Sequence, residues 1–496
     1  MDKDESSYKD TVKSTAVFGG AQVVQMLITI FKAKFIAVVL GSHGMGANAI
    51  FQSTFAIISS LSSFGIFQSA VRDISQANES GDGKALSKIN KLFVRMSWCA
   101  GILGLLFCLL LSSWMSKIAF ENYDFKWHFA LLSVALLFAA LSNSKTAFLQ
   151  GTRNVTYLAK STLVGGLLGL LVSLPALYYF GLYGIVVSII ITPLFLYLSQ
   201  VYFSRSIKLE KADDLSLKNT IADAKPIAKL GTILMLGMVT MTGFSYLTNI
   251  LIGRFGQIEH VGLYQGVSSI SVQSIAIVFY VLASDFFPKL SAVYNDNKKV
   301  NVMVNQQTEL VLLIIGPIVI VLVIFAHIIV KLLLSDEFLV MVPVLRLMSL
   351  ALIGRGIWVV MSYVILAKGD KKAYFFYDCL LGNGLLFVFN IIAYYYWGLN
   401  GLGISMLLGS MVVSIILISV VTIKYGFHFH KETKKIIFFI FIIMITCYGF
   451  TQLFEGWLQY ICSAFSFIIM FFYSFSVLNK RIQITKFLKN KFGFKS

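Results

Sequence analysis

Stretches of about 20 predominantly apolar residues recur along the whole of this 496-residue chain. Such a stretch, folded as a helix, matches the hydrocarbon thickness of a bilayer, which needs about 20 residues. Only 13% of the residues are charged, whereas soluble domains carry roughly 25%. Because lipid offers no hydrogen-bond partners to the backbone, spanning segments of this kind are helical. The sequence therefore predicts an all-α polytopic membrane protein.

We predict about 14 transmembrane helices. Their ranges are 15–40, 48–71, 96–114, 127–149, 156–180, 183–204, 230–252, 261–287, 310–333, 345–366, 374–396, 402–423, 436–454 and 457–478.

Basic residues are distributed very unevenly between the two sides of these helices. With a cytoplasmic N-terminus, 33 of the 41 Lys and Arg residues lie on the inner side, 5 lie on the outer side, and 3 lie inside spans. The positive-inside rule therefore places both termini in the cytoplasm. The net charge of +18 is then mostly a consequence of topology, so we expect no nucleic-acid partner.

Two parts of the chain resemble each other. The segment 179–185 (YFGLYGI) matches 396–402 (YWGLNGL) at an offset of 217, and both hold two glycines in a tight turn. Weaker matches at offsets of 218 and 213 pair Gly151 with Gly369, Gly166 with Gly384, Lys160 with Asp378, and Phe51-Gln52 with Tyr264-Gln265. An offset that covers six helices predicts two pseudo-symmetric six-helix lobes of equal orientation, a parallel repeat.

This repeat divides the chain into predicted parts. They are a cytoplasmic N-terminal tail (1–14), an N-lobe of helices 1–6 (15–204), a cytoplasmic linker (205–229), a C-lobe of helices 7–12 (230–423), two extra helices (436–478) and a basic cytoplasmic tail (479–496). Two lobes around a central cavity are a transporter architecture.

Few basic residues lie within the predicted spans, and these are the candidates for binding a substrate. Lys32 and Lys34 lie in helix 1, about 200° apart around the helix axis, so one lines the cavity and the other packs or reaches the interface. Arg355 lies deep in helix 10, where it either binds an anion or pairs with an acid. Arg254 ends helix 7 on the outer side, where positive charge is scarce. This balance favours an anionic substrate, and phosphate or pyrophosphate fits best.

Acidic and polar residues supply further candidates. Asp378 in helix 11 could pair with a cation or carry a proton, and Asp285 lies near the inner end of helix 8. Helices 2 and 8 are rich in hydroxyl and amide side chains, among them Gln52, Gln265 and Ser268. These side chains could contact sugars, but small polar residues serve helix packing equally well.

Other chemistry has no support in the sequence. The five cysteines all lie in apolar runs without a CxxC pair, which predicts neither a disulfide framework nor a metal site. There is no phosphate-binding loop of the type that ends in Lys-Ser or Lys-Thr, and no catalytic constellation. We therefore expect a protein without a cofactor that is not an enzyme.

Several motifs resemble a known family. The segment 34–41 (KFIAVVLG), followed by Gly44 and Gly46, looks like the helix 1–2 region of bacterial lipid-linked oligosaccharide flippases. The segment 262–271 (GLYQGVSSIS) is similar to the helix 8 opening of the O-antigen and enterobacterial-common-antigen branch. The segments 332–338 (LLLSDEF) and 363–368 (YVILAK) continue the match. The resemblance covers helices 1–12.

The resemblance implies the polysaccharide transporter branch of the multidrug/oligosaccharidyl-lipid/polysaccharide exporter superfamily. Such proteins move undecaprenyl-pyrophosphate-linked oligosaccharide, an O-antigen or other surface polysaccharide repeat unit, from the inner to the outer leaflet of the bacterial inner membrane by alternating access. Lys34 matches the family's helix 1 cation, and Asp378 matches an acidic position in helix 11. Lys32 and Asn249 depart from the family pattern. A polymerase and other assembly proteins are the implied partners.

Three alternatives remain open. The extra helix pair resembles that of the lipid II flippase, where it forms a lipid groove. A drug or cation exporter of the same superfamily would need a cavity of acids and aromatic rings, which the buried charges disfavour. A polysaccharide polymerase or ligase would need a sizeable outer loop, which the predicted topology lacks.

Overall fold

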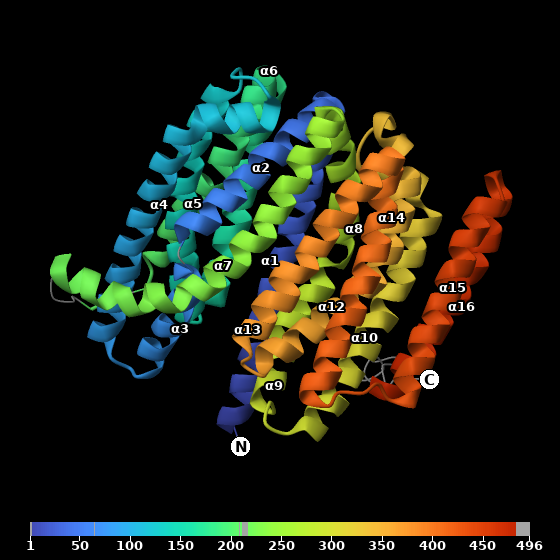
Figure 1. The fold of residues 1–496 in the computed structure, drawn as a ribbon. Coiled ribbons are helices and arrows are strands. Elements are labelled where there is room, and N and C mark those ends of the chain that lie inside the picture. Colours follow the sequence, from blue (N-terminus) through green and yellow to red (C-terminus); the bar gives the residue numbers. More distant parts are fainter. Residues whose placement is uncertain (1, 64, 208, 211–216, 483–496) are drawn as a thin grey trace. The chain divides into compact units, whose positions relative to one another are not determined.

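The computed structural model describes residues 2–63, 65–207, 209–210 and 217–482, and these residues form helices joined by short turns (Figure 1). No strand occurs in this described part of the chain. The chain divides into two compact units, Met1–Gln265 and Gly266–Ser496.

The first unit contains the helices up to the beginning of α8. They are α1 (Asp2–Val39), α2 (Gly41–Ser63), α3 (Ile66–Glu79), α4 (Gly83–Phe120), α5 (Lys126–Gly151), α6 (Val155–Ser204), α7 (Leu217–Phe255) and α8 (Ile258–Val281), which continues into the second unit.

The second unit contains the helices that follow. They are η1 (Leu282–Phe286), α9 (Phe287–Ala292), α10 (Asn297–Ile324), α11 (Ala326–Leu333), η2 (Asp336–Met341), α12 (Val342–Ala367), α13 (Lys371–Ala373), η3 (Tyr374–Gly382), α14 (Asn383–Tyr425), α15 (Lys431–Leu453) and α16 (Gly456–Ile482). The elements η1 and η3 are π-helices, and η2 is a 3₁₀ helix.

Eleven helical segments of the described residues are long and apolar enough to cross a membrane. The all-helical, multi-pass membrane fold is therefore confirmed. Two of these segments, Val155–Ser204 and Lys371–Tyr425, have 50 and 55 residues, and each is long enough for two crossings at about 20 residues apiece. The number fourteen stays a prediction.

Both long segments bend at a glycine, as the repeat predicts. Gly181 has φ 53° and ψ −121°, and Gly398 has φ 56° and ψ −139°. Side chains with a Cβ rarely adopt this region, and glycine does so freely. The two halves of α6 and the two halves of α14 therefore meet in turns of the same geometry.

The chain packs against itself in the same way at both turns. A Cβ on Gly184 would lie 2.1 Å from the carbonyl oxygen of Ala176, and one on Gly401 would lie 2.0 Å from that of Ala393. The glycines, and likewise the carbonyls they face, are related by an offset of 217 (401 − 184 and 393 − 176). The repeat read from the sequence is therefore present in the backbone.

The turn between α5 and α6 corrects one of the sequence matches. Arg153 follows α5 with φ 56°, and Gly369 follows α12 with φ 72°. Because both residues take the rare left-handed conformation at the same place in the turn, Gly369 corresponds to Arg153 rather than to Gly151. The offset here is 216 (369 − 153), whereas the sequence match implied 218.

Two helices start earlier than their apolar runs. Asp82 accepts from the backbone N–H groups of the first residues of α4, and Asp296 does the same for α10, at 3.0–3.1 Å. A capping carboxylate satisfies backbone donors that the helix leaves unpaired. The helices therefore begin at Gly83 and Asn297, whereas hydropathy alone located the spans at 96 and 310.

The second predicted span, 48–71, is wrong at its inner end. Gly65 has φ 63°, a conformation that ends a right-handed helix, so α2 stops at Ser63. The amphipathic α3 then packs its apolar face on a buried cluster that includes Phe93 and Phe148.

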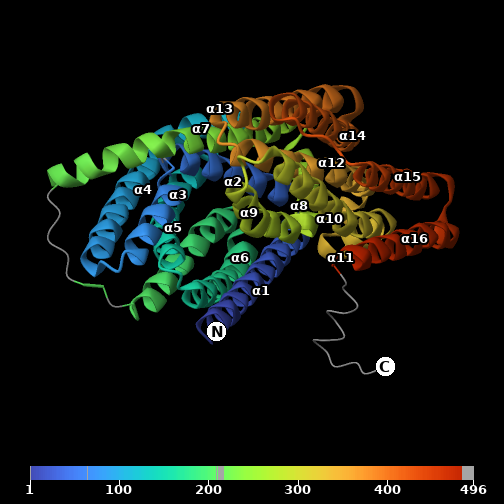
Figure 2. The ribbon, with the colours of Figure 1, turned by 90° about the horizontal axis from the view of Figure 1, so that it is seen from below.

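The predicted linker 205–229 is partly helical, because α7 begins at Leu217; its residues 208 and 211–216 lie outside the described residues. The extra helices α15 and α16 pack against each other and against α10 of the second unit (Figures 1 and 2).

Candidate functional site

The two helix 1 lysines lie on different sides of α1. Lys32 donates from its ammonium group to the backbone carbonyl of Ser188 in α6, at 3.3 Å. Lys34 follows two residues later and is partly buried. Because two residues correspond to about 200° around a helix, Lys34 faces away from the side of α1 that carries Lys32.

Arg254 lies at the end of α7 and is exposed. Its guanidinium donates to the carbonyl oxygen of Ile118 at 3.1 Å and lies 3.8 Å from a carboxylate oxygen of Glu121. Ile118 belongs to the last turn of α4, where the helix dipole favours a positive charge. In this structure Arg254 therefore stabilises the end of α4.

Most hydroxyl groups in helices 2 and 8 bond within their own helix. Those of Ser53, Thr54, Ser60, Ser62 and Ser63 donate to carbonyls three or four residues earlier in α2, and those of Ser269 and Ser274 do so in α8. The amide of Gln52 is exposed, and Gln265 and Ser268 are partly buried.

Asp378 is the centre of a buried polar cluster in the second unit. Only 6% of the residue is exposed. One carboxylate oxygen accepts from the indole N–H of Trp358 and from the hydroxyl of Ser362 at 2.5 Å. Both donors lie on α12, so the carboxylate joins η3 to α12.

Arg355 belongs to the same cluster. Its guanidinium carbon lies 5.2 Å from the centre of the Trp358 ring, within the range of a cation–π contact. It is also a charged neighbour of Asp378. The structure therefore brings Arg355 and Asp378 together, as two candidates from different helices, through Trp358.

Asp378 lies in the π-helix η3, and the repeat explains why. The offset between the two halves is 216 at Gly369 and 217 at Gly398. A π-helical turn holds one residue more than an α-helical turn, and η3 lies between these positions. The extra residue is therefore in η3. At either offset Asp378 aligns with a hydroxyl residue of α6, Thr162 or Ser161, and the predicted match to Lys160 is wrong.

Asp285 lies in the other π-helix, η1. Its carboxylate pairs with the ammonium group of Lys289 at 2.6 Å, and both side chains are more than half exposed. This contact is that of an ordinary surface ion pair, which contributes at most about 1 kcal/mol.

A network of polar side chains holds the turn between α12 and α13. Asp370 accepts from the backbone N–H of Ala373, from the ammonium group of Lys424 and from the hydroxyl of Tyr425, at 2.9, 2.9 and 3.1 Å. The backbone N–H of Ala373 and the Lys424 ammonium lower the pKa of Asp370. The network ties the start of α13 to the end of α14.

The segment before α15 is bound by two asparagines, one turn apart on α10. Asn301 accepts from the backbone N–H of His428, and Asn305 from that of His430, both at 2.9 Å. The Asn305 amide also donates to the His428 carbonyl at 3.0 Å. Three backbone polar groups of this segment are thus satisfied by α10.

The same face of α10 continues to Glu309, of which 5% is exposed. Its carboxylate accepts from the hydroxyl of Thr433 on α15 at 2.7 Å and pairs with Arg481 on α16 at 3.1 Å. One buried acid therefore holds both extra helices.

Arg346 holds the other end of α15. Its guanidinium donates to the carbonyl oxygens of Val323 in α10 and Thr451 in α15, at 3.3 and 3.4 Å. Both carbonyls belong to last turns of helices, where a cation is favourable. The extra pair is therefore fixed to the second unit at both ends.

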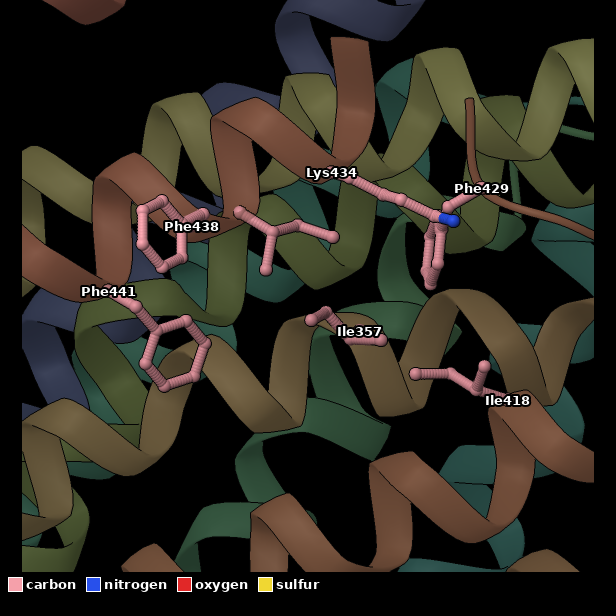
Figure 3. Close-up of a pocket in the computed structure, with 7 residues that line it drawn as sticks. Ile357, Ile418, Phe429, Lys434, Phe438 and Phe441 are labelled. Atoms are coloured by element: carbon pink, nitrogen blue, oxygen red, sulfur yellow. The ribbon is translucent and has the colours of Figure 1, made fainter. Parts of the chain in front are cut away.

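A cleft of about 350 Å³ lies where α15 approaches α12 and α14 (Figure 3). Lys434 and Phe429 lie at one end, and Phe438 and Phe441 lie at the other. The lining residues are Ile357, Ile418, Phe429, Lys434, Ile437, Phe438 and Phe441. The cleft is therefore apolar with a single ammonium group.

Sequence reasoning named Arg355 but missed Trp358 and Ser362, the two hydrogen-bond donors to Asp378. Arg355, Trp358 and Ser362 are spaced i, i+3 and i+7, which places them on one face of a helix, and this spacing was visible in the sequence. The α10 face was not visible, because its partners on α15 and before it lie far away along the chain. In the described part of the chain, no three His, Cys, Asp or Glu side chains gather as a metal ion would require.

Solved structures with a similar fold are membrane transporters. The lipid II flippase MurJ, in an inward-closed conformation, has a TM-score of 0.72 and 13% identity over 94% of this chain and 99% of its own. An inward-facing multidrug resistance MATE family transporter has a TM-score of 0.70 and 15% identity over 83% and 96%. A transporter from Pyrococcus furiosus has a TM-score of 0.62 and 14% identity over 84% and 95%. The fold is thus that of the MOP superfamily.

The family is shown by a separate comparison. Residues 35–343, more than half of the chain, match the family model of polysaccharide biosynthesis proteins. The chain belongs to this polysaccharide biosynthesis protein family. No curated protein matches it in sequence.

Proposed function

We propose that the protein is a flippase for undecaprenyl-pyrophosphate-linked oligosaccharide, an O-antigen or other surface polysaccharide repeat unit. The observation that carries the proposal is that a polysaccharide biosynthesis protein has the fold of a membrane transporter. A biosynthetic intermediate that crosses the membrane explains both facts. The protein would lie in the bacterial inner membrane. The flipped repeat unit would pass to a polymerase on the outer side.

The pyrophosphate would be bound by Lys34 and Arg355. A guanidinium can bind phosphate oxygens with two parallel hydrogen bonds, and the cation–π contact with Trp358 would hold Arg355 in position. Lys32 would support the same region by fixing α1 to α6 through Ser188. Arg254 would contribute a further positive charge for the pyrophosphate at the outer end of α7.

Asp378 would couple transport to protons or to the membrane potential. Arg355 is a charged neighbour of the Asp378 carboxylate. A pyrophosphate that takes over Arg355 would leave this buried carboxylate without its cation, which favours uptake of a proton. Each charge moved across the membrane is worth about 2.3 kcal/mol per 100 mV. Asp285 would serve as an interfacial ion pair.

The lipid and the glycan would be bound at separate places. The apolar cleft beside α15 (Figure 3) would take part of the isoprenoid chain, with Lys434 toward the phosphate end. The glycan would contact Gln52, Gln265 and Ser268, because most neighbouring hydroxyls are bonded within their helices.

A flipping assay in proteoliposomes tests this proposal. Lys34→Ala and Arg355→Ala should each reduce transport of the lipid-linked glycan at least about tenfold, whereas Lys431→Ala, an exposed lysine at the start of α15, should not. Full activity of both variants would reject the assigned binding site. Transport of lipid II with equal efficiency would instead favour a lipid II flippase, the alternative that the extra helices and the length of the MurJ match support.

A further inference from the structure

The first turns of α2 and α8 touch backbone to backbone within the first unit. A Cβ on Gly46 would lie 2.0 Å from the carbonyl oxygen of Ile258, and a Cβ on Gly262 would lie 1.9 Å from that of Ser42. No side chain fits at either position at this distance. The two glycines are therefore what allows the helices to meet here.

The contact is reciprocal. An offset of 216 relates Gly46 to Gly262 (262 − 46) and Ser42 to Ile258 (258 − 42), and the same offset relates the α5–α6 turn to its counterpart. Gly46 therefore faces Ile258, and its repeat equivalent Gly262 faces Ser42, the repeat equivalent of Ile258. An arrangement in which i touches j and j touches i is the mark of a two-fold axis. A local pseudo-two-fold axis therefore relates these two helix ends.

One hydrogen-bonded pair of side chains lies across the same contact. The Nδ1 atom of His43 lies 2.9 Å from a carboxylate oxygen of Glu259, and the offset is again 216 (259 − 43). His43 and Glu259 are therefore repeat equivalents of each other, and they form a contact with each other. Two carboxylates at this position would repel each other, whereas a histidine in one half and a glutamate in the other form a hydrogen bond. The common offset also shows that the predicted match of Phe51-Gln52 to Tyr264-Gln265, at 213, is wrong.

We propose that this contact is the outer closure of the transport path and that His43 and Glu259 are its latch. In the predicted orientation, α1 runs outward to Val39 and α7 runs outward to Phe255, so α2 and α8 both begin at the outer surface. The inference rests on the proposed flippase function and on alternating access, the mechanism that the family resemblance implies. It adds which residues must separate before the glycan leaves on the outer side.

The two parts of the closure contribute differently. His43 and Glu259 are 47% and 40% exposed, and exposed ion pairs contribute little. The glycine contact instead depends on a fit that one methyl group destroys. The glycines therefore set how closely the helices approach, and the pair biases the closed arrangement.

Thiol labelling tests the closure without any substrate. The reporter thiol is introduced by Ser42→Cys, at a residue that is 2% exposed, in a chain whose native cysteines have been replaced. A membrane-impermeant methanethiosulfonate reagent is added to right-side-out vesicles. Gly46→Ala and Gly262→Ala should each raise the labelling rate at least about tenfold. Gly253→Ala is the matched control, because its Cβ would meet only Val261 at 3.5 Å.

Exchanging the two charged residues tests the latch even if the glycine variants fail to fold. His43→Gln and Glu259→Gln should each raise the labelling rate, by at most about fivefold for an exposed pair. The double variant His43→Glu with Glu259→His should return it to the wild-type rate, because the positions are equivalent.

The outcomes separate this inference from the proposed function. Slow labelling in all glycine and charge variants would overturn the closure, whatever substrate the protein moves. Faster labelling in a protein that moves no lipid-linked glycan would support the closure and reject the proposed substrate.

Discussion

The indole of Trp358 and the carboxylate of Asp378 are joined by a hydrogen bond between two buried side chains. The same carboxylate oxygen accepts from Ser362, one helical turn after Trp358. The guanidinium carbon of Arg355 lies 5.2 Å from the centre of the same indole ring. The indole therefore contacts both Asp378 and Arg355, the acid and the arginine that we predicted deep within the spans of the C-lobe.

Replacing the acid tests its proposed role in coupling. Asp378→Asn keeps an oxygen that can accept from Trp358 and Ser362, so the thermal midpoint should change little. It removes the charge beside Arg355, so proton- or potential-driven flipping should fall at least about tenfold. The measurement is flipping in proteoliposomes with and without a pH gradient, and a variant that responds to the gradient like the wild type would contradict the role.

Trp358→Phe should instead lower the thermal midpoint. It leaves the charge in place but removes one donor to a buried carboxylate, which costs about 1–3 kcal/mol. The midpoint of thermal unfolding in detergent should therefore fall. No change in that midpoint would show that the hydrogen bond adds nothing to stability.

The extra residue of η3 can be removed. Deleting Phe376, which is 49% exposed, should convert the π-helix to an α-helix and turn Asp378 away from Trp358. A buried carboxylate that loses its partners costs about 3–5 kcal/mol, so stability and flipping should both fall. Phe376→Ala keeps the residue count and should retain both. Equal behaviour of the two variants would refute the insertion.

The attachment of the extra helices can be measured by a double-mutant cycle. Arg481→Gln leaves the buried Glu309 without its cation and should lower the free energy of unfolding by about 1–3 kcal/mol, since Arg481 itself is half exposed. The double variant Glu309→Gln with Arg481→Gln should recover most of this loss. Additive effects of the two substitutions, measured by chemical unfolding, would mean that the pair is not coupled.

The Asp370 network predicts a dependence on pH. Its hydrogen bonds lower the pKa of Asp370, so its stabilising effect is present above the pKa of an unfolded aspartate, about 3.9, and is lost as pH falls through the lower folded pKa. Asp370→Asn should therefore be less stable than the wild type at pH 7, by at most about 1 kcal/mol for an exposed pair, and equal to it near pH 2. Lys424→Gln should show the same profile. A difference that persists at low pH would contradict this origin.

The membrane fold and the repeat were predictable from the sequence because both depend on local composition. Apolar length fixes the spans, and Gly181 and Gly398 mark turns that need a left-handed residue. The register could not be read in the same way. The left-handed conformation of Arg153 and the extra residue of η3 shift the offset without any signal in residue type.

The site was predictable only as a set of charges. Deep positions in apolar helices identified Arg355 and Asp378, because a charge there requires a partner. Their connection through Trp358 depends on how α12 and η3 pack. Likewise, Glu309 was hidden, because its partners Thr433 and Arg481 lie on helices far away along the chain.

The central claim is tested most directly by mass spectrometry of lipid-linked glycans in cells depleted of this protein. The proposed function predicts that an undecaprenyl-pyrophosphate-linked repeat unit accumulates and that its glycan resists a hydrolase added outside spheroplasts, because it faces the cytoplasm. A lipid-linked glycan pool that stays at the wild-type level, or one that the external hydrolase digests, would contradict it.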